Sequence, residues 1–390
     1  MSVTMTSKRT GKLNHATVSD VHLFHPRVFT VWILRSLSQE LIDKQEDKDL
    51  DYIWFAGDVF DRIAQLPQSE VLMVHTWIGI FLMHCQKHNI RVRILEGTPS
   101  HDRGQSNLFV KINNLLAAPA NLRYHDKLCI DYEEEFDFNV LYVPDEWRHD
   151  PEITWNEVVD ELRTKGLDKV DISVMHGTMD FQVPKFLNIP GVHQSKRYSD
   201  ITNWFVTIGH QHVMSVSRNI YAQGSLDRLS QNEEQDKGHF RFMIDMDKDV
   251  VVPEFRVNRN AMPHRDVNVS DLEFTEAFEK ACMVADDILT LDTPLEVRYY
   301  GFIRLSMSEA HYANGLLSSL KSQYPQLSWD RKIIADKEKE AENDSMDFAL
   351  DEAIALSPVN AMEVMTQELS LLPASDAERQ LALSLFEEVI

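Results

Sequence analysis

Short apolar runs, each followed at once by a cluster of His, Asp and Gly, constrain the fold of this chain most strongly. The run at 52–56 leads into Gly57 and Asp58, and the run at 205–208 leads to His210. Between such runs lie amphipathic segments whose apolar residues recur at three- and four-residue spacing, as in helices that cover a sheet. This alternation of strand and helix patterns favours an α/β or α+β sandwich, which is the fold class that we predict.

The same pattern predicts individual elements in the first 250 or so residues. Strands are expected at residues 15–18, 52–56, 92–95, 140–143, 172–175 and 205–208, and helices at 28–44, 69–88 and 155–164. Two further β-rich runs, 240–244 and 250–257, are expected to close the same unit.

Changes of pattern divide the chain into four parts. A polar, flexible start at 1–12 precedes the main unit at 13–258. A small α+β unit follows at 259–335, and the last part, 336–390, is acidic and rich in helix formers. The small unit is expected to contain a helix, a strand and a second helix, at 272–289, 295–305 and 309–323.

Composition excludes several classes of protein. The net charge of −23 counts against a free-standing DNA binder, because so acidic a body repels a polyanion at long range. Cys85, Cys129 and Cys282 are far apart and never form a C-x-x-C pair, which argues against a disulfide framework or a thiolate metal site. No apolar run approaches the length of a membrane span. We therefore expect a cytoplasmic protein that is neither secreted nor embedded in a membrane.

Five clusters of metal-ligating residue types follow the predicted strands. They contain Asp20 and His22; Asp58 and Asp61; Ser100, His101 and Asp102; His176; and His210 and His212. Because strands in α/β sheets place ligands at their carboxyl ends, these clusters are expected to converge. Imidazole, carboxylate and hydroxyl ligands without thiolate suit Mn²⁺, Fe²⁺ or Zn²⁺.

The order of these clusters resembles a known signature. The series D-x-H, G-D-x-x-D, G-N-H-D, H-G and G-H-x-H belongs to calcineurin-like metallophosphoesterases, and this chain matches four of the five closely. Within that superfamily it resembles the SbcD nuclease subunit and its counterparts in double-strand-break repair, including phage-encoded versions. The resemblance rests also on the segments 19–23 and 224–230, and it covers roughly residues 13 to 335. It implies a four-layer β-sandwich flanked by helices, with a small capping domain and a helical C-terminal tail.

The resemblance also implies a role for each residue. Asp58 would bridge two divalent metal ions, with Mn²⁺ as the expected ion. One ion's shell would be completed by Asp20, His22 and His212, and the other's by Ser100, His176 and His210. His101 would protonate the leaving oxygen, Asp102 would orient His101, and Asp61 would orient a metal ligand from outside the shell.

Four residues carry weaker expectations. Ser100 stands where the family has asparagine, so that the second metal would be held by a poorer oxygen ligand or through water. Arg103 could neutralise a substrate phosphate or pair with a surface carboxylate. The segment 224–230 is either a turn or a loop that lines the site with Ser225 and touches DNA through Arg228.

The function that this resemblance implies is that of a metal-dependent DNA exonuclease and endonuclease subunit in a recombination and repair complex. An SbcC-like coiled-coil ATPase would bind the helices of 336–390 and supply affinity for DNA. A homodimer is also expected, with the apolar helix near 71–85 as a possible surface. Two alternatives remain: a phosphoesterase for a small molecule or a phosphoprotein, and a catalytically weak scaffold of the same fold.

Overall fold

The structure is a computed structural model that describes residues 11–334, except 65–68, 147, 185, 188, 231–232, 292, 294–297 and 299–300. All the described residues belong to one compact unit. The expected flexible start, apart from 11–12, and the expected partner-binding tail at 336–390 lie outside the described residues.

The first sheet has six strands in the order β12-β11-β1-β2-β3-β4. These are β1 Lys12–Val18, β2 Tyr52–Ala56, β3 Arg91–Leu95, β4 Leu122–His125, β11 Gly238–Asp245 and β12 Val250–Val257. The first four run parallel, whereas β11 pairs antiparallel with both β1 and β12. Every residue of β2 and β3 is buried, as expected of central parallel strands covered on both faces.

The second sheet also has six strands, in the order β5-β6-β7-β8-β10-β9. They are β5 Cys129–Glu133, β6 Phe138–Val143, β7 Val170–His176, β8 Thr202–Gly209, β9 Ser215–Ser217 and β10 Ile220–Ala222. The strands β6, β7, β8 and β10 run parallel. All the strands expected from the sequence in the first 258 residues are present, within three residues at each end.

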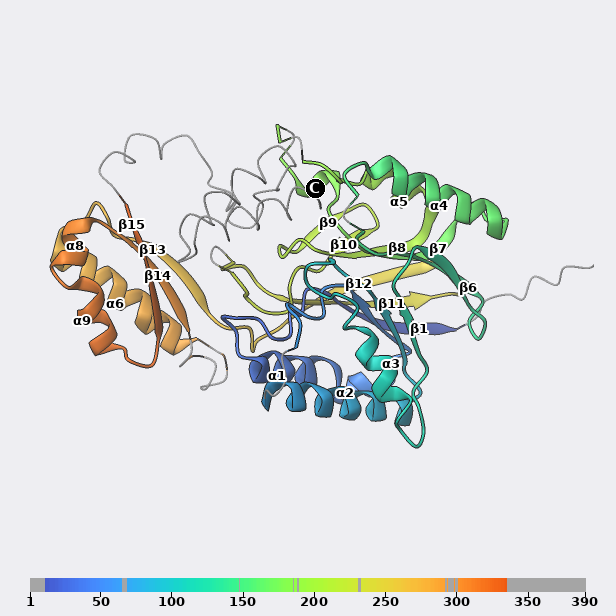
Figure 1. Ribbon diagram of the computed structural model, residues 1–390, viewed down its shortest axis with the longest axis horizontal. Coiled ribbons are helices and arrows are strands. Elements are labelled where there is room, and N and C mark those ends of the chain that lie inside the picture. The colour runs from blue at the N-terminus through green and yellow to red at the C-terminus, as the bar shows by residue number, and fades with distance from the viewer. Residues whose placement is uncertain are drawn as a thin grey trace, which may run out of the picture. The chain divides into compact units, whose positions relative to one another are not determined.

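Three apolar clusters give the main unit its layers. One contains side chains of both sheets, among them Trp54, Tyr142 and Phe242, so that the sheets pack face to face. The others lie between each sheet and its helices, which Figure 1 shows on opposite sides of the sheet pair. The helices are α1 Thr30–Leu41, α2 Ser69–Lys87 and α3 Asn107–Asn113 against the first sheet, and α4 Pro151–Lys165 and α5 Ser195–Ile201 against the second. The fold is thus mixed α/β and compatible with the predicted sandwich.

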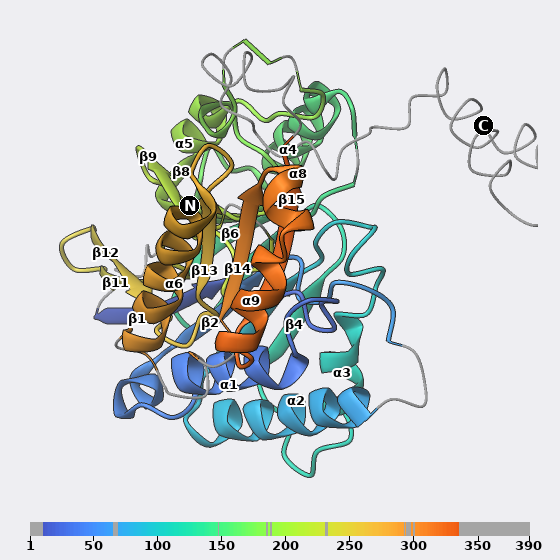
Figure 2. The same cartoon turned by 90° about the vertical axis from the view of Figure 1, so that its left-hand side faces the viewer.

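A third, three-stranded sheet follows the two large sheets in sequence. Its strands, β13 His264–Asn268, β14 Phe302–Met307 and β15 Ser328–Ile333, are all parallel. The helices α6 Phe274–Thr290, α8 Glu309–Ala313 and α9 Leu316–Gln323 belong to the same unit, and Figure 2 shows α6 and α9 in front of the sheet. This region combines helices with a sheet, and its all-parallel strands give it α/β character where an α+β unit was expected for 259–335.

One prediction for this small unit was wrong in detail, and another lies partly outside the described residues. Of the strand expected at 295–305, residues 302–305 belong to β14, whereas 295–297 and 299–300 are among the residues that the structure does not describe. The helix expected at 309–323 is interrupted at Gly315, whose φ of +81° is a left-handed conformation that ends α8 and begins α9. Apolar spacing continues across this break, so periodicity alone did not reveal it.

Several short elements had no clear pattern in the sequence. They include the helices α3 and α5, the strands β4, β5, β13 and β15, and the 3₁₀ turns Gln45–Asp49 and Asp180–Gln182. Elements of this length carry too few residues to display a period. Among the described residues, no helix has the length and apolar character needed to cross a membrane.

Candidate metal centre

The carboxyl ends of four parallel strands position the candidate ligands. Asp20 follows β1 and Asp58 follows β2, two adjacent strands of the first sheet. His176 ends β7 and His210 follows β8, which are adjacent in the second sheet. The loops after β1 and β2 are joined by backbone hydrogen bonds, including one from the His22 amide to the Asp58 carbonyl at 3.1 Å. The convergence expected from the sequence is therefore observed.

The backbone at this junction is strained. Asp20, His22, Asp58 and His210 have φ angles of 49°, 52°, 50° and 101°, in the left-handed region that L-residues seldom occupy. Such conformations cost free energy and cluster at functional sites, where the surrounding structure enforces them. The strain here falls on four candidate ligands from three different loops.

The first group of ligands consists of Asp20, His22 and His212, whose ligating atoms all lie within 4.8 Å of one another. The Asp20 carboxylate accepts a hydrogen bond from the His210 amide at 2.9 Å, which ties the first loop to the last. Nε2 of His22 is buried and has no hydrogen-bond partner among the described residues. A buried, unpartnered imidazole nitrogen is costly unless something binds to it.

The second group consists of Asp58, His176 and His210, which again lie within 4.8 Å of one another. Nε2 of His176 is 3.2 Å from Asp58 Oδ2, and His22 Nε2 is 3.9 Å from the same oxygen. Asp58 therefore lies between the two groups. Nδ1 of His176 is 2.8 Å from the Ala56 carbonyl oxygen, so Nδ1 carries the hydrogen and Nε2 faces the carboxylate. Burial lowers the pKa of His176, but the Asp58 carboxylate outweighs it and raises that pKa to about 10.

The hydroxyl group at this cluster belongs to Thr98, and this differs from the expectation for Ser100. The Thr98 hydroxyl donates to Asp58 Oδ2 at 3.2 Å and lies 3.2 Å from His176 Nε2 and 3.3 Å from His210 Nδ1. The Thr98 amide also donates to Asp58 Oδ1 at 2.6 Å. Ser100 is half-buried, and its carbonyl accepts from the Arg103 guanidinium instead. The turn after β3 presents its first hydroxyl to the cluster, whereas the family resemblance had implied the second.

His101 lies beside the first group and is held by Asp61 rather than by Asp102. Its ring is 4.8 Å from that of His22, and its Nδ1 is 3.1 Å from the Asp61 carbonyl oxygen. The Asp61 carboxylate is 3.1 Å from His22 Nδ1, the position expected for a carboxylate that orients a ligand. The fully buried Asp102 accepts instead from the amides of Phe60 and Gly97, both at 2.8 Å. Asp102 thus shapes the loop that carries His101 without contacting its ring.

Sequence reasoning missed Glu233. This buried carboxylate lies 2.8 Å from His212 Nδ1 and 2.7 Å from the ammonium of Lys237, whose side chain is 1% exposed. Burial raises the pKa of Glu233, but His212 and Lys237 together hold it well below its usual range. Glu233 thereby orients His212 as Asp61 orients His22. An acidic residue four positions before a lysine was the available signal.

The two remaining candidates, from the segment 224–230, make hydrogen bonds within the protein. Ser225 is fully buried, and its hydroxyl donates to the Asp227 carbonyl and accepts from Lys237. The Arg228 guanidinium donates to the carbonyls of Ala261 and Met262, both at 3.2 Å. The Arg228 guanidinium thus ties this segment to the chain that leads into β13. Arg103 is exposed, with a φ of 48°.

Glycines allow the loops to approach this closely. A Cβ atom at Gly97 would lie 2.1 Å from the Asp58 amide nitrogen and 2.2 Å from its carboxylate. A Cβ atom at Gly57 would lie 2.2 Å from His176 Nδ1, and the φ of Gly57 is +83°. Both separations are far below van der Waals contact, so the glycines are a requirement of the cluster.

These buried His and Asp groups could hold a metal ion. The fit is chemical as well as geometric, because imidazole and carboxylate ligands suit a borderline or hard divalent cation. The unpartnered Nε2 of His22 and the strained ligand loops are both accounted for by such an ion. His22, His176 and His212 each have their other ring nitrogen held by a carboxylate or a carbonyl, as is usual for metal-ligating histidines.

No protein-family model and no curated protein matches this chain. Among solved structures, the TT1561 protein of Thermus thermophilus is similar with a TM-score of 0.37 and 11% identity, over 63% of this chain and 99% of that one. A second solved structure has a TM-score of 0.36 and 12% identity over the same shares. With TM-scores this low, neither likeness bears on the fold or the function of this chain.

Proposed function

We propose that this protein is a metal-dependent hydrolase of phosphodiester bonds, and more specifically a DNA exonuclease and endonuclease subunit. One observation carries the proposal: two buried His/Asp groups adjoin each other, with the Asp58 carboxylate 3.2 Å from His176 and 3.9 Å from His22. Two ions a few ångströms apart are the arrangement by which many phosphatases and nucleases act.

In this proposal each group would hold one divalent ion, with Asp58 available to both. Asp20, His22 and His212 would hold one ion, and His176 and His210 the other, with the Thr98 hydroxyl beside them. Mn²⁺ is the ion we favour, since the donors are nitrogen and oxygen without thiolate. When bound, such ions lower the pKa of a water molecule and neutralise charge on the phosphate.

His101 is the candidate general acid. Its side chain is 28% exposed, whereas those of His22 and His176 are nearly or fully buried, so substrate could reach it. The Asp61 carbonyl holds Nδ1 and leaves Nε2 to carry the proton that a leaving oxygen needs. The Asp61 carboxylate, 3.9 Å from Nδ1, would stabilise the protonated ring.

The proposed function also includes DNA as the substrate and two protein partners. A protein with a net charge of −23 has little electrostatic attraction for DNA, so we propose that an SbcC-like coiled-coil ATPase binds the DNA and brings it to the site. We also propose a homodimer through α2, where Leu72, Ile80 and Met83 are 70%, 48% and 51% exposed. In this scheme the complex acts in the cytoplasm of a bacterial or phage-infected cell.

The test is Mn²⁺-dependent degradation of linear duplex and single-stranded DNA, with bis(4-nitrophenyl) phosphate as a small diester. Asp58→Ala should abolish hydrolysis of both substrates, because it removes the shared carboxylate. His101→Ala should slow DNA cleavage by about 10²–10⁴-fold, the usual contribution of a general acid. It should spare the nitrophenyl ester more, since nitrophenolate needs little protonation to leave.

A matched control is His75→Ala, which removes an exposed histidine of α2 and should change neither rate. Cleavage of the small diester with DNA left intact would replace the nuclease by a phosphoesterase for a small molecule or a phosphoprotein. Absence of Mn²⁺ binding in calorimetry would favour a scaffold without chemistry.

A further inference from the structure

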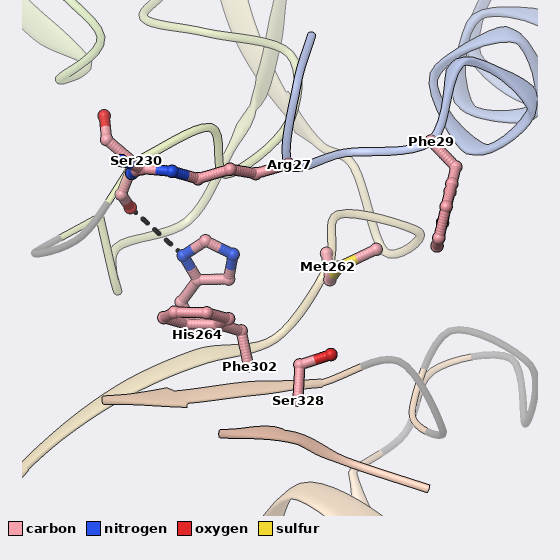
Figure 3. A pocket seen from close by; sticks show the side chains of 7 residues that line it. All are labelled: Arg27, Phe29, Ser230, Met262, His264, Phe302 and Ser328. Atoms are coloured by element: carbon pink, nitrogen blue, oxygen red, sulfur yellow. Dashed lines mark hydrogen bonds between the residues drawn. The ribbon is translucent and has the colours of Figure 1, made fainter. Parts of the chain in front are cut away.

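A pocket lies between the amino edge of the small parallel sheet and the loop that joins β1 to α1 (Figure 3). Its volume is about 100 Å³. A single water molecule needs roughly 10–15 Å³ on a comparable measure, so this space admits an organic group of several atoms.

The floor of the pocket is one row across the sheet. His264, Phe302 and Ser328 are the first residues of β13, β14 and β15, and they are directly paired in register. The rings of His264 and Phe302 are 5.1 Å apart with 40° between their planes. The row therefore offers two neighbouring aromatic rings and a hydroxyl group to whatever enters.

His264 is a neutral hydrogen-bond acceptor on this floor. Its Nδ1 lies 3.1 Å from the Ser230 carbonyl oxygen, as Figure 3 shows, so Nδ1 carries the hydrogen. Burial lowers the pKa of His264 to about 4 and keeps the ring uncharged near neutral pH. Nε2 is thus an acceptor, which matches a donor such as an exocyclic amine.

The opposite wall supplies an exposed aromatic ring and a cation. Phe29 is 54% exposed, and in Figure 3 the side chain of Arg27 extends from the same loop towards Ser230. Arg27 makes no side-chain ion pair with any residue that the structure describes. His25 fixes this loop, because its Nδ1 accepts from the amides of Arg27 and Val28, both at 3.2 Å.

The pocket is linked to the candidate metal centre on two sides. The Ser230 hydroxyl donates to Glu233 Oε1 at 2.8 Å, and the same oxygen is 2.8 Å from His212 Nδ1. On the other side, the ring of His25 is 6.4 Å from that of His22. Side chains that hold the metal ligands are thus bonded to, or adjacent to, the walls of the pocket.

We propose that this pocket binds a nucleobase of the strand whose phosphate lies at the metal centre, with Arg27 at a neighbouring phosphate. Aromatic faces stack on any base, and a cation beside them suits the backbone that every base carries. The Nε2 acceptor of His264 favours bases with an exocyclic amine over thymine. This inference rests on the proposed function and makes it more specific, since a small phosphoester has no base to place here.

The test measures base stacking separately from catalysis. A single-stranded decamer with one 2-aminopurine, which loses fluorescence when it stacks, is titrated with the full-length protein in EDTA at low salt. We expect quenching on binding, and an affinity lowered about 5- to 150-fold by Phe29→Ala, the range for one lost stacking contact. Arg27→Ala should weaken binding and reduce its salt dependence, because one phosphate contact is lost.

Matched controls are Tyr132→Ala and Arg163→Ala, an exposed aromatic residue on β5 and an exposed arginine on α4, which should bind as the wild type does. All four variants should bind Mn²⁺ in calorimetry as the wild type does, which shows that the metal centre is intact. Unquenched 2-aminopurine, equal binding of an abasic strand, or unchanged affinity of Phe29→Ala would each overturn the nucleobase site. Quenching without any Mn²⁺-dependent DNA cleavage would instead refute the nuclease and leave the pocket standing.

Discussion

Removal of the Glu233 carboxylate is expected to destabilise the protein strongly. Glu233 is 2.7 Å from the Lys237 ammonium, and the two side chains are 8% and 1% exposed. Glu233→Ala leaves this ammonium buried without its counter-charge, which typically costs about 3–5 kcal/mol of unfolding free energy. Lys237 still donates to the His212 carbonyl and the Ser225 hydroxyl. Because these two bonds remain, we expect a loss of about 3 kcal/mol, at the lower end of the range.

Urea unfolding followed by tryptophan fluorescence at pH 7 measures this loss. The control is Asp200→Ala, which breaks the ion pair with Lys196, another lysine and carboxylate four residues apart. Its two side chains are 70% and 51% exposed, so solvent screens the pair and the loss of unfolding free energy should be much smaller than for Glu233→Ala. The double variant Glu233→Gln with Lys237→Met should recover part of the stability, because no charge is left unpaired. Equal losses of unfolding free energy in Glu233→Ala and Asp200→Ala would refute the idea that burial makes the unpaired Lys237 ammonium costly.

Three further predictions concern the site and the core. Thr98→Val should weaken Mn²⁺ binding by about tenfold or more in calorimetry, whereas Ser100→Ala should change it by less than about twofold. Gly97→Ala should abolish Mn²⁺ binding, because its Cβ would overlap both the Asp58 backbone amide and the Asp58 carboxylate. Burial lowers the pKa of His15 to about 3, so stability should fall by on the order of 4 kcal/mol as pH drops from about 6.5 towards 3. His15→Gln should remove this slope from the pH dependence of the urea midpoint.

The sign of the His15 effect follows from its place in the core. Nδ1 of His15 accepts a hydrogen bond from Trp54 Nε1 at 3.1 Å, and the ring is fully buried among aromatic side chains. As pH falls below the ordinary histidine pKa, the unfolded chain takes up a proton that the folded chain refuses until the pH nears the lowered pKa of about 3. The neutral ring is thus a stabilising feature above about pH 6.5 that is lost on acidification.

The sequence by itself determined the strands and the residues that follow them. Central parallel strands are apolar on both faces, so the runs 52–56 and 205–208 can be recognised as strands from the sequence alone. Because adjacent parallel strands end on one edge of a sheet, Asp20 could be expected to lie near Asp58, and His176 near His210. Local chemistry and spacing were sufficient for both inferences.

Tertiary structure alone decided which neighbouring groups complete the site. Thr98 and Ser100 are both hydroxyl residues of one turn, and only the path of that turn over Asp58 distinguishes them. Glu233 reaches His212 because the chain returns after β10, a fold-back across 21 positions that leaves no periodic signal. The row that floors the pocket likewise joins strands far apart in sequence. Spacing along a chain records which groups can be presented at a strand end, whereas contact between groups depends on how separate loops pack.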